Sequence, residues 1–213
     1  MYSCGYPGFS IEKPILALYN PESLSGKQKS GSYYGELKLK IRRGFLTIDY
    51  KHQIDFFRHT INIPEKNMAL AFERLENMQL PEKTVFDSGI YIDDNQPRLF
   101  IFDILILKGN KLTQTCLQRR KLLETLIKTD ELIWRPVFAD MWFREFDLML
   151  TGKSTLVKRA ALNYGIPYEK LVNNVEGLVV KDKKSQLRYP DKVYFSPSFF
   201  KLRMDLVKKY QEK

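Results

Sequence analysis

Three short charged segments occur in a fixed order along the 213-residue chain and contain residue types that could do chemistry together. They are Glu36-Leu37-Lys38, residues 176–181 (EGLVVK) and Phe200-Lys201-Leu202-Arg203. A lysine that becomes covalently nucleotidylated needs a strand that holds it, a carboxylate that binds metal, and cations that offset the charge of a triphosphate. The three segments supply these types, so the sequence predicts nucleotidyl transfer.

Lys38 is the candidate nucleophile. A lysine amine is protonated at neutral pH, so a nucleophilic lysine must be desolvated or held among cations that lower its pKa. Lys40, Arg42 and Arg43 are close to it in sequence, and the basic residues of the last segment could converge on it. In an alternating strand Glu36, Lys38 and Lys40 share one face. Taken alone, this pattern also fits a solvated charged face on an edge strand.

Strands dominate the segments that would position these residues. Strands are expected at 33–41, 45–50, 84–92, 98–107, 175–181 and 199–203, and helices at 67–77, 117–128, 141–150 and 154–163. Gly44 would join the first two strands in a hairpin, and the composition of residues 19–31 predicts a surface loop. The nearly continuous apolar run at 98–107 suits a strand buried on both faces. The mixture predicts an α+β domain.

Several other residues have a structural interpretation. Ser154 is expected to cap the start of a helix, and Trp134 and Trp142 are expected in the core. Asp87-Ser88-Gly89 fits a turn before a strand and a site role about equally well. These alternatives stay open at the level of the sequence.

Composition narrows the class of protein. The chain has 35 Lys and Arg against 25 Asp and Glu, a formal charge of +10 that favours a polyanionic partner or a phosphate-rich ligand. Its two cysteines, Cys4 and Cys116, and two histidines, His52 and His59, are too few and too scattered for a convincing zinc site or disulfide framework. With no apolar run of membrane-spanning length, we expect a soluble intracellular protein without a membrane partner.

A family resemblance follows from the order of these motifs. Residues 36–43 (ELKLKIRR) resemble the nucleotidylation motif of ATP-dependent DNA ligases, Glu-x-Lys-x-Asp-Gly-x-Arg. Residues 102–123, 176–181 and 199–205 are similar to later motifs of the same family, and 13–17 to the segment before its lysine. The resemblance implies an α+β nucleotidyltransferase (adenylation) domain, with twisted antiparallel sheets flanked by helices in an ATP-grasp-like ligase catalytic core. It would form a single domain over residues 1–213, with no OB-fold.

The resemblance also implies roles for individual residues. Lys38 would attack the α-phosphate of ATP and release pyrophosphate, leaving lysyl-AMP. Glu36 would read the adenine amino group, Arg43 would contact the ribose, and Phe102 would stack on the base. Glu176 would help to place Mg²⁺ or Mn²⁺. The remaining nucleotide-binding residues would be Arg58, Lys181, Lys201 and Arg203, of which the last two would offset phosphate charge.

Two departures from the family pattern bear on activity. Lys40-Ile41 stands where the family has Asp-Gly, and Asp87-Ser88-Gly89 stands where its third motif usually reads Asp-Gly-Glu. Each departure removes a carboxylate. The alternative to an active enzyme is therefore a catalytically reduced relative of the ligases. Such a relative would bind nucleic acid or a protein partner.

The function that the resemblance implies is the sealing of nicks in nucleic acid. Nicked DNA is the expected partner and RNA the second choice, and an RNA ligase or an mRNA-capping guanylyltransferase is the alternative enzyme. Three alternatives stay open for the missing OB-fold: the chain is a minimal domain that acts alone, the OB-fold was removed from a longer chain, or a partner protein supplies it. The chain is expected to be a monomer. The expected location is the cytoplasm, the nucleus or a virus-infected cell.

Overall fold

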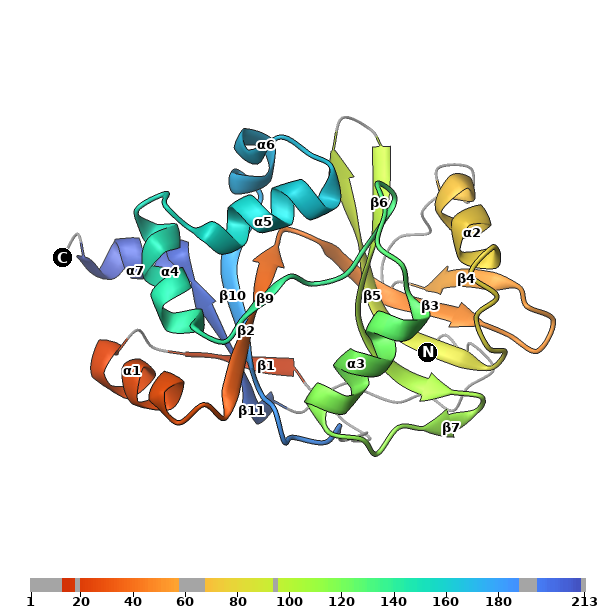
Figure 1. The fold of residues 1–213 in the computed structure, drawn as a ribbon, viewed down its shortest axis with the longest axis horizontal. Helices are drawn as coiled ribbons and strands as arrows, with labels where there is room; N and C mark the ends of the chain where they lie inside the picture. The colour runs from red at the N-terminus through yellow and green to blue at the C-terminus, as the bar shows by residue number, and fades with distance from the viewer. Residues whose placement is uncertain (1–12, 18–19, 58–67, 94–95, 188–194, 212–213) are drawn as a thin grey trace. The chain divides into compact units, whose positions relative to one another are not determined.

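The computed structural model describes residues 13–17, 20–57, 68–93, 96–187 and 195–211 of the chain (Figure 1). Their backbone forms two compact units. We call the described residues of 13–40 and 136–211 the Lys38 unit, and those of 41–135 the Arg43 unit. That residues 1–213 form a single domain without an OB-fold stays a prediction.

A five-stranded sheet runs through the Lys38 unit in the order β1-β11-β10-β2-β9. Its strands are β1 (Lys13–Leu16), β2 (Tyr33–Leu39), β9 (Phe138–Ala139), β10 (Val175–Asp182) and β11 (Phe195–Arg203). Neighbouring strands are antiparallel, except that β1 and β11 are parallel. Because β2 has a partner on each side, Lys38 does not lie on an edge strand.

Helix α4 covers part of this sheet on the face opposite Lys38. The described helices of the unit are α1 (Pro21–Lys29), α4 (Trp142–Leu150), α5 (Thr155–Tyr164), α6 (Tyr168–Val172) and α7 (Met204–Gln211). Helix α4 packs on β2 and β10, where the fully buried Trp142 contacts the ring of Phe200. Gly35 makes room for this indole, since a Cβ at position 35 would lie 2.5 Å from the Cβ of Trp142. The apolar face anchors strands whose other face is charged.

The Arg43 unit has its own sheet, in the order β4-β3-β5-β6-β7, with β8 paired in parallel to β6. Its strands are β3 (Arg42–Ile48), β4 (Ile54–Phe57), β5 (Thr84–Asp93), β6 (Gln96–Leu107), β7 (Asn110–Lys111) and β8 (Ile133–Trp134). Its described helices are α2 (Ala69–Glu76) and α3 (Cys116–Leu126). Strands β5 and β6 form a long antiparallel pair whose register shifts twice.

One face of this second sheet forms the main apolar core of the Arg43 unit. Leu46, Phe86 and Ile104 are fully buried there, together with Leu75 of α2 and Leu123 of α3. Side chains alternate along a strand, so the residues between these core positions point to the other face. That other face carries the residues of interest for function.

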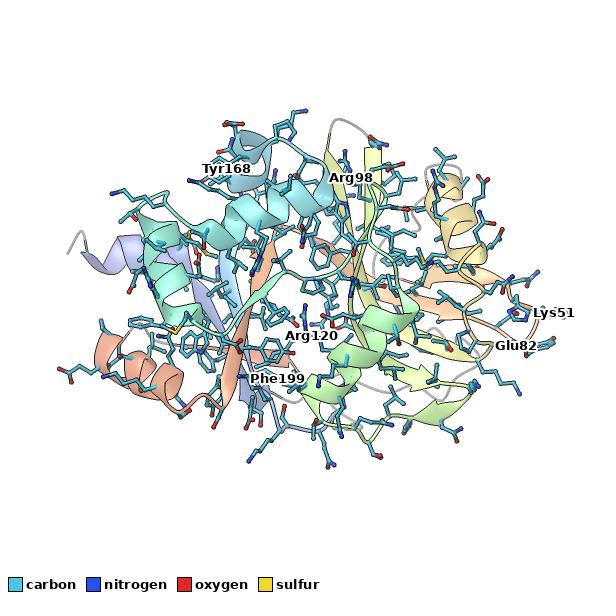
Figure 2. All side chains as sticks on the ribbon, in the orientation of Figure 1. Lys51, Glu82, Arg98, Arg120, Tyr168 and Phe199 are labelled. Carbon is cyan, nitrogen blue, oxygen red and sulfur yellow. The ribbon has the colours of Figure 1, made fainter. Side chains whose placement is uncertain are left out.

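An aromatic cluster lies on the other face. The rings of Phe100 and Phe102 are 5.0 Å apart, and those of Tyr91 and Trp134 are 5.1 Å apart. Phe100 also meets Trp134 edge-on, and the guanidinium of Arg98, a residue labelled in Figure 2, lies 5.2 Å from the centre of the Trp134 ring. These contacts hold the partly exposed Phe102 in a fixed place.

Several structural predictions are confirmed. Trp134 and Trp142 are fully buried, and β6 is the long buried strand expected at 98–107. The hydroxyl of Ser154 accepts a hydrogen bond from the backbone N–H of Val157, as an N-cap does.

In the residues that the structure describes, no helix is long and apolar enough to cross a membrane.

The predicted surface loop at 19–31 is wrong, because most of this segment forms α1. The side chain of Asn20 accepts a hydrogen bond from the backbone N–H of Ser23, and Pro21 occupies the first turn. An asparagine N-cap followed by proline is a strong helix start. Those local signals outweigh the Gly- and Ser-rich composition.

The predicted hairpin around Gly44 is also wrong. Strand β2 pairs with β9 and β10, whereas β3 pairs with β4 and β5 in the other sheet. Gly44 lies inside β3, and the chain passes from one unit to the other just before that strand. Likewise Asp87-Ser88-Gly89 forms no turn, since all three residues lie within β5.

Candidate active site

The polar face of the first sheet gathers most of the predicted site residues of the Lys38 unit. Residues opposite one another in an antiparallel pair share a face, as do residues two apart. Three rows therefore cross β2, β10 and β11 on one face: Lys38, Gly177 and Arg203; Glu36, Val179 and Lys201; Tyr34, Lys181 and Phe199. The fold thus brings Lys38, Glu36, Lys181, Lys201 and Arg203 onto one surface.

Lys38 and Glu176 form an ion pair through Nζ and Oε2, and both side chains are partly exposed. Glu176 reaches this position because the register between β10 and β2 shifts between Val175 and Gly177. Gly177 has a φ of 141°, and any Cβ there would overlap the backbone oxygen of Leu202. The close approach of β10 to β11 thus requires glycine and fixes the carboxylate that faces the lysine.

A second ion pair lies beside the first. Lys181 Nζ is 2.7 Å from Glu36 Oε2, and both side chains are largely buried. A buried carboxylate and ammonium that face each other hold one another in place, because either alone would carry an uncompensated charge. Glu36 is therefore a fixed carboxylate, one row from Lys38.

The two cations of β11 differ in their contacts. Arg203 donates two hydrogen bonds to Asp205, from Nε at 3.0 Å and Nη2 at 2.7 Å. These bonds lower the pKa of the Asp205 carboxyl. Lys201 is half-buried and lies opposite Val179 of β10.

Lys40, which stands where the ligase pattern has aspartate, contacts the end of α6. Its Nζ donates to the carbonyl oxygen of Asn173 at 3.3 Å, and its backbone N–H donates to that of Asn174 at 2.8 Å. A lysine is favourable at a helix C-terminus, where carbonyl groups lack partners. The ammonium group of Lys40 therefore has a structural role at the end of α6.

In the Arg43 unit, Arg43 forms a two-bond ion pair with Asp87. Its Nε donates to Oδ1 at 2.7 Å, and its Nη2 donates to Oδ2. Asp87 lies directly opposite Asp103 on β6, and Asp103 forms its own two-bond pair with the fully buried Arg119 of α3, at 3.0 and 2.9 Å. Two neighbouring Arg–Asp ion pairs thus connect these elements: one joins β3 to β5, and the other joins β6 to α3.

The sequence does not predict these pairings. Asp87 lies in the segment that stands at the third ligase motif, and Asp103 and Arg119 lie in the similar segment 102–123. Their types suit ion pairs, but the partner depends on strand register, which the sequence of a single chain does not specify. Two bulges in the β5–β6 pair make that register harder still to predict.

The described residues contain no cluster of three or more His, Cys, Asp or Glu side chains that could hold a metal ion. Glu176 offers one carboxylate. Mg²⁺ is commonly held by one or two carboxylates, with substrate phosphates and water completing its shell. The donor set therefore fits Mg²⁺ or Mn²⁺ only together with a phosphate ligand.

Arg58, the remaining predicted nucleotide-binding residue, lies outside the described residues. The other predicted site residues all lie on described strands. Glu36, Lys38, Glu176, Lys181, Lys201 and Arg203 belong to the Lys38 unit, and Arg43 and Phe102 to the Arg43 unit.

Comparison with known proteins places the fold. No protein-family model and no curated protein sequence matches the chain. Many solved structures match by fold, among them the following three, all of low sequence identity. The ligase domain of LigD from M. tuberculosis is 16% identical over 90% of this chain and 60% of that chain, with a TM-score of 0.57. A protein named Pmar-Lig_Pre is 15% identical over 92% of this chain and 46% of that one, with a TM-score of 0.58.

The ATP-dependent DNA ligase of bacteriophage T7, solved in complex with ATP, is 13% identical over 91% of this chain and 68% of its own, with a TM-score of 0.52. The chain thus spans 60% and 46% of the first two proteins. It has the α+β fold of ATP-dependent DNA ligase adenylation domains, as the sequence motifs predicted.

Proposed function

We propose that the chain is a ligase-type nucleotidyltransferase that forms a lysyl-AMP intermediate at Lys38 and takes part in sealing nicks, with DNA as the preferred nucleic acid. The contact between Lys38 and Glu176 carries the proposal. A lysine and a carboxylate from distant parts of the chain meet on a sheet face that also holds Glu36, Lys181 and Lys201.

The first step is attack by the neutral Nζ of Lys38 on the α-phosphorus of ATP. A P–N bond forms, the bond between the α-phosphorus and its bridging oxygen breaks, and pyrophosphate leaves. The Nζ atom gives up a proton, and the carboxylate of Glu176 is in contact with that atom. In the later steps AMP passes to a 5′-phosphate, and a 3′-hydroxyl displaces it.

The remaining residues bind and orient the nucleotide. Glu36, fixed by Lys181, presents a carboxylate that can accept hydrogen bonds from the adenine amino group. Lys201 and Arg203 offset phosphate charge, and a divalent cation held by Glu176 would add to this neutralisation. Phe102 offers a ring face for the base, and Arg43 offers N–H groups for the ribose.

Covalent labelling tests this proposal. The purified chain is incubated with α-labelled ATP or, separately, GTP in Mg²⁺ or Mn²⁺, and acid-labile label on the protein is measured. We expect label from ATP that is lost in Lys38→Ala and retained in Lys158→Ala, which removes an exposed lysine of α5. Label from GTP alone would favour a guanylyltransferase instead. No label from either nucleotide on a folded protein would overturn the enzymatic proposal.

A second candidate is a relative that binds nucleic acid or a partner protein without adenylation. Lys40 and Gly89 favour it, because each stands where the ligase pattern has a carboxylate. If this candidate is correct, the protein that carries no label binds nicked DNA. The Lys38→Ala variant then binds it with the same affinity. An active enzyme instead couples the label to the nucleic acid, which then carries AMP on its 5′-phosphate.

A further inference from the structure

Gly89 lies in β5 directly opposite Arg43 of β3, so a side chain at position 89 would face the same way as that arginine. The surroundings leave no room for one. A Cβ on Gly89 would overlap Cγ2 of Ile41 and would lie 3.1 Å from the backbone oxygen of Arg42 and 3.2 Å from Cε2 of Phe102. Position 89 therefore cannot accept a side chain while Ile41 is present.

One residue of each departure from the ligase pattern takes part in this contact. The pattern places glycine at position 41 and glutamate at position 89, whereas this chain has isoleucine and glycine. The branch of Ile41 occupies the space that the first atoms of a side chain at position 89 would need. Ile41 and Gly89 therefore fit one another sterically, and we refer to this pairing as the steric exchange.

The exchange changes the chemistry beside Arg43. Ile41, Gly89 and Phe102 present hydrocarbon and backbone, without a side-chain hydrogen-bond acceptor. Both carboxylate oxygens of the nearby, mostly buried Asp87 already accept bonds from Arg43. A sugar beside Arg43 can bond to the N–H groups of this exposed guanidinium, whereas the carboxylate of Asp87 is mostly buried and paired with Arg43 through both oxygens.

We infer that Ile41 and Gly89 together set the sugar specificity of the nucleotide site, which binds ribonucleoside and 2′-deoxyribonucleoside triphosphates with similar affinity. This inference rests on the proposed function, in which Arg43 contacts the ribose. The guanidinium of Arg43 is exposed and already paired with Asp87, so water can replace a missing sugar hydroxyl there, and we expect the affinities to differ by less than about tenfold. A site built to bond a hydroxyl with a buried partner discriminates far more strongly, because the partner is left unpaired when the hydroxyl is absent.

Equilibrium binding of ATP and dATP to Lys38→Ala tests the inference without turnover. Each nucleotide is titrated with Mg²⁺ into the full chain by calorimetry. We expect both to bind with dissociation constants that differ by less than about tenfold. Binding of both with ATP favoured by more than that overturns the inference and leaves the proposed function standing. Binding of neither nucleotide by a folded protein overturns the proposed function and the inference together.

Restoring the ligase pattern tests the steric exchange. Gly89→Glu alone should lower the unfolding midpoint strongly, because its Cβ meets Ile41. The matched control is Gly26→Glu, which adds the same side chain where a Cβ would meet nothing within 4 Å. Equal midpoints for these two variants would contradict the exchange.

The double change Ile41→Gly with Gly89→Glu removes the overlap and places an acceptor beside Arg43. In the Lys38→Ala background it should recover most of the midpoint lost by Gly89→Glu alone. It should also raise the preference for ATP over dATP by at least about tenfold relative to the parent. A folded double variant with an unchanged preference would overturn the assignment of these two residues to sugar specificity.

Discussion

Gly177 determines how Glu176 faces Lys38, because its backbone conformation and its lack of a side chain let β10 approach β11 closely. We expect Gly177→Ala to destabilise the protein by the cost of a positive φ, about 1–2 kcal/mol, plus about 1–3 kcal/mol for the overlap with Leu202. Urea unfolding monitored by circular dichroism measures this loss.

Gly152→Ala is the control for Gly177→Ala. Gly152 also has a positive φ, of 69°, but a Cβ there would meet nothing within 4 Å. The control should therefore lose only the conformational part of the stability. Equal losses in the two variants would show that the approach of β10 to β11 does not depend on Gly177.

Arg119 is fully buried, and Asp103 holds its guanidinium by two hydrogen bonds. Removing one charge of such a pair leaves the other without a partner, so Arg119→Met should cost about 3–5 kcal/mol of unfolding free energy. Arg119→Met with Asp103→Leu removes both charges and should cost less. Chemical denaturation of the wild type, the single variant and the double variant measures the difference in unfolding free energy. A double variant less stable than Arg119→Met would contradict this account.

The sequence predicts on which face of a strand a residue lies better than it predicts which residue lies opposite it. Alternation along β2 correctly predicts that Glu36 and Lys38 share a face, because the period of a strand is two. The partner of each residue depends on strand register and is not predicted by that period. The bulge beside Gly177, which brings Glu176 to Lys38, has no signal in the sequence other than the glycine itself.

The junction of α4 and α5 depends on one carboxylate, Glu145. It accepts hydrogen bonds from the hydroxyls of Ser154 and Thr155 and from the backbone N–H of Leu156. Desolvation raises the pKa of Glu145, but these hydrogen bonds outweigh it, so the pKa is lowered. Because the charged carboxylate is the favoured form, it should stabilise the start of α5.

Glu145→Gln should therefore lower the thermal unfolding midpoint at neutral pH. A carboxyl whose pKa is lower in the folded state stabilises above its ordinary pKa, and this stabilisation is lost as pH falls through the folded-state value. The difference between wild type and variant should thus shrink in acid. Glu169→Gln, at an exposed position of α6, is the control. A midpoint difference that stays constant with pH would contradict the role of the charge.

Whole elements were easier to predict where local signals agreed. The apolar run of β6 and the N-cap of α5 identify these elements directly. The prediction of a loop at helix α1 is wrong because the Ser- and Gly-rich composition of this segment indicates a loop, whereas Asn20 and Pro21 form a helix start. The separation of β2 from β3 into different sheets was also missed. Two strands joined by two residues normally pair, and no local signal marks the passage between units.

The formal charge of +10 predicts how the whole molecule binds nucleic acid. Cations that contact phosphates release counterions, so affinity falls with salt. Contacts to four phosphates would weaken binding of nicked DNA about a hundredfold between 50 and 200 mM salt. Fluorescence anisotropy with nicked DNA and with nicked RNA measures this slope and the preference between them. Affinity that does not change with salt would contradict an electrostatic contribution.

In the proposed function, Lys38 carries the nucleotide covalently. The most direct test of this step is to incubate the protein with ATP and divalent metal, digest it, and identify the modified residue by mass spectrometry. The account predicts AMP on the peptide that contains Lys38, through an acid-labile bond that pyrophosphate reverses. AMP on another residue, or no covalent nucleotide on the folded protein, would contradict it.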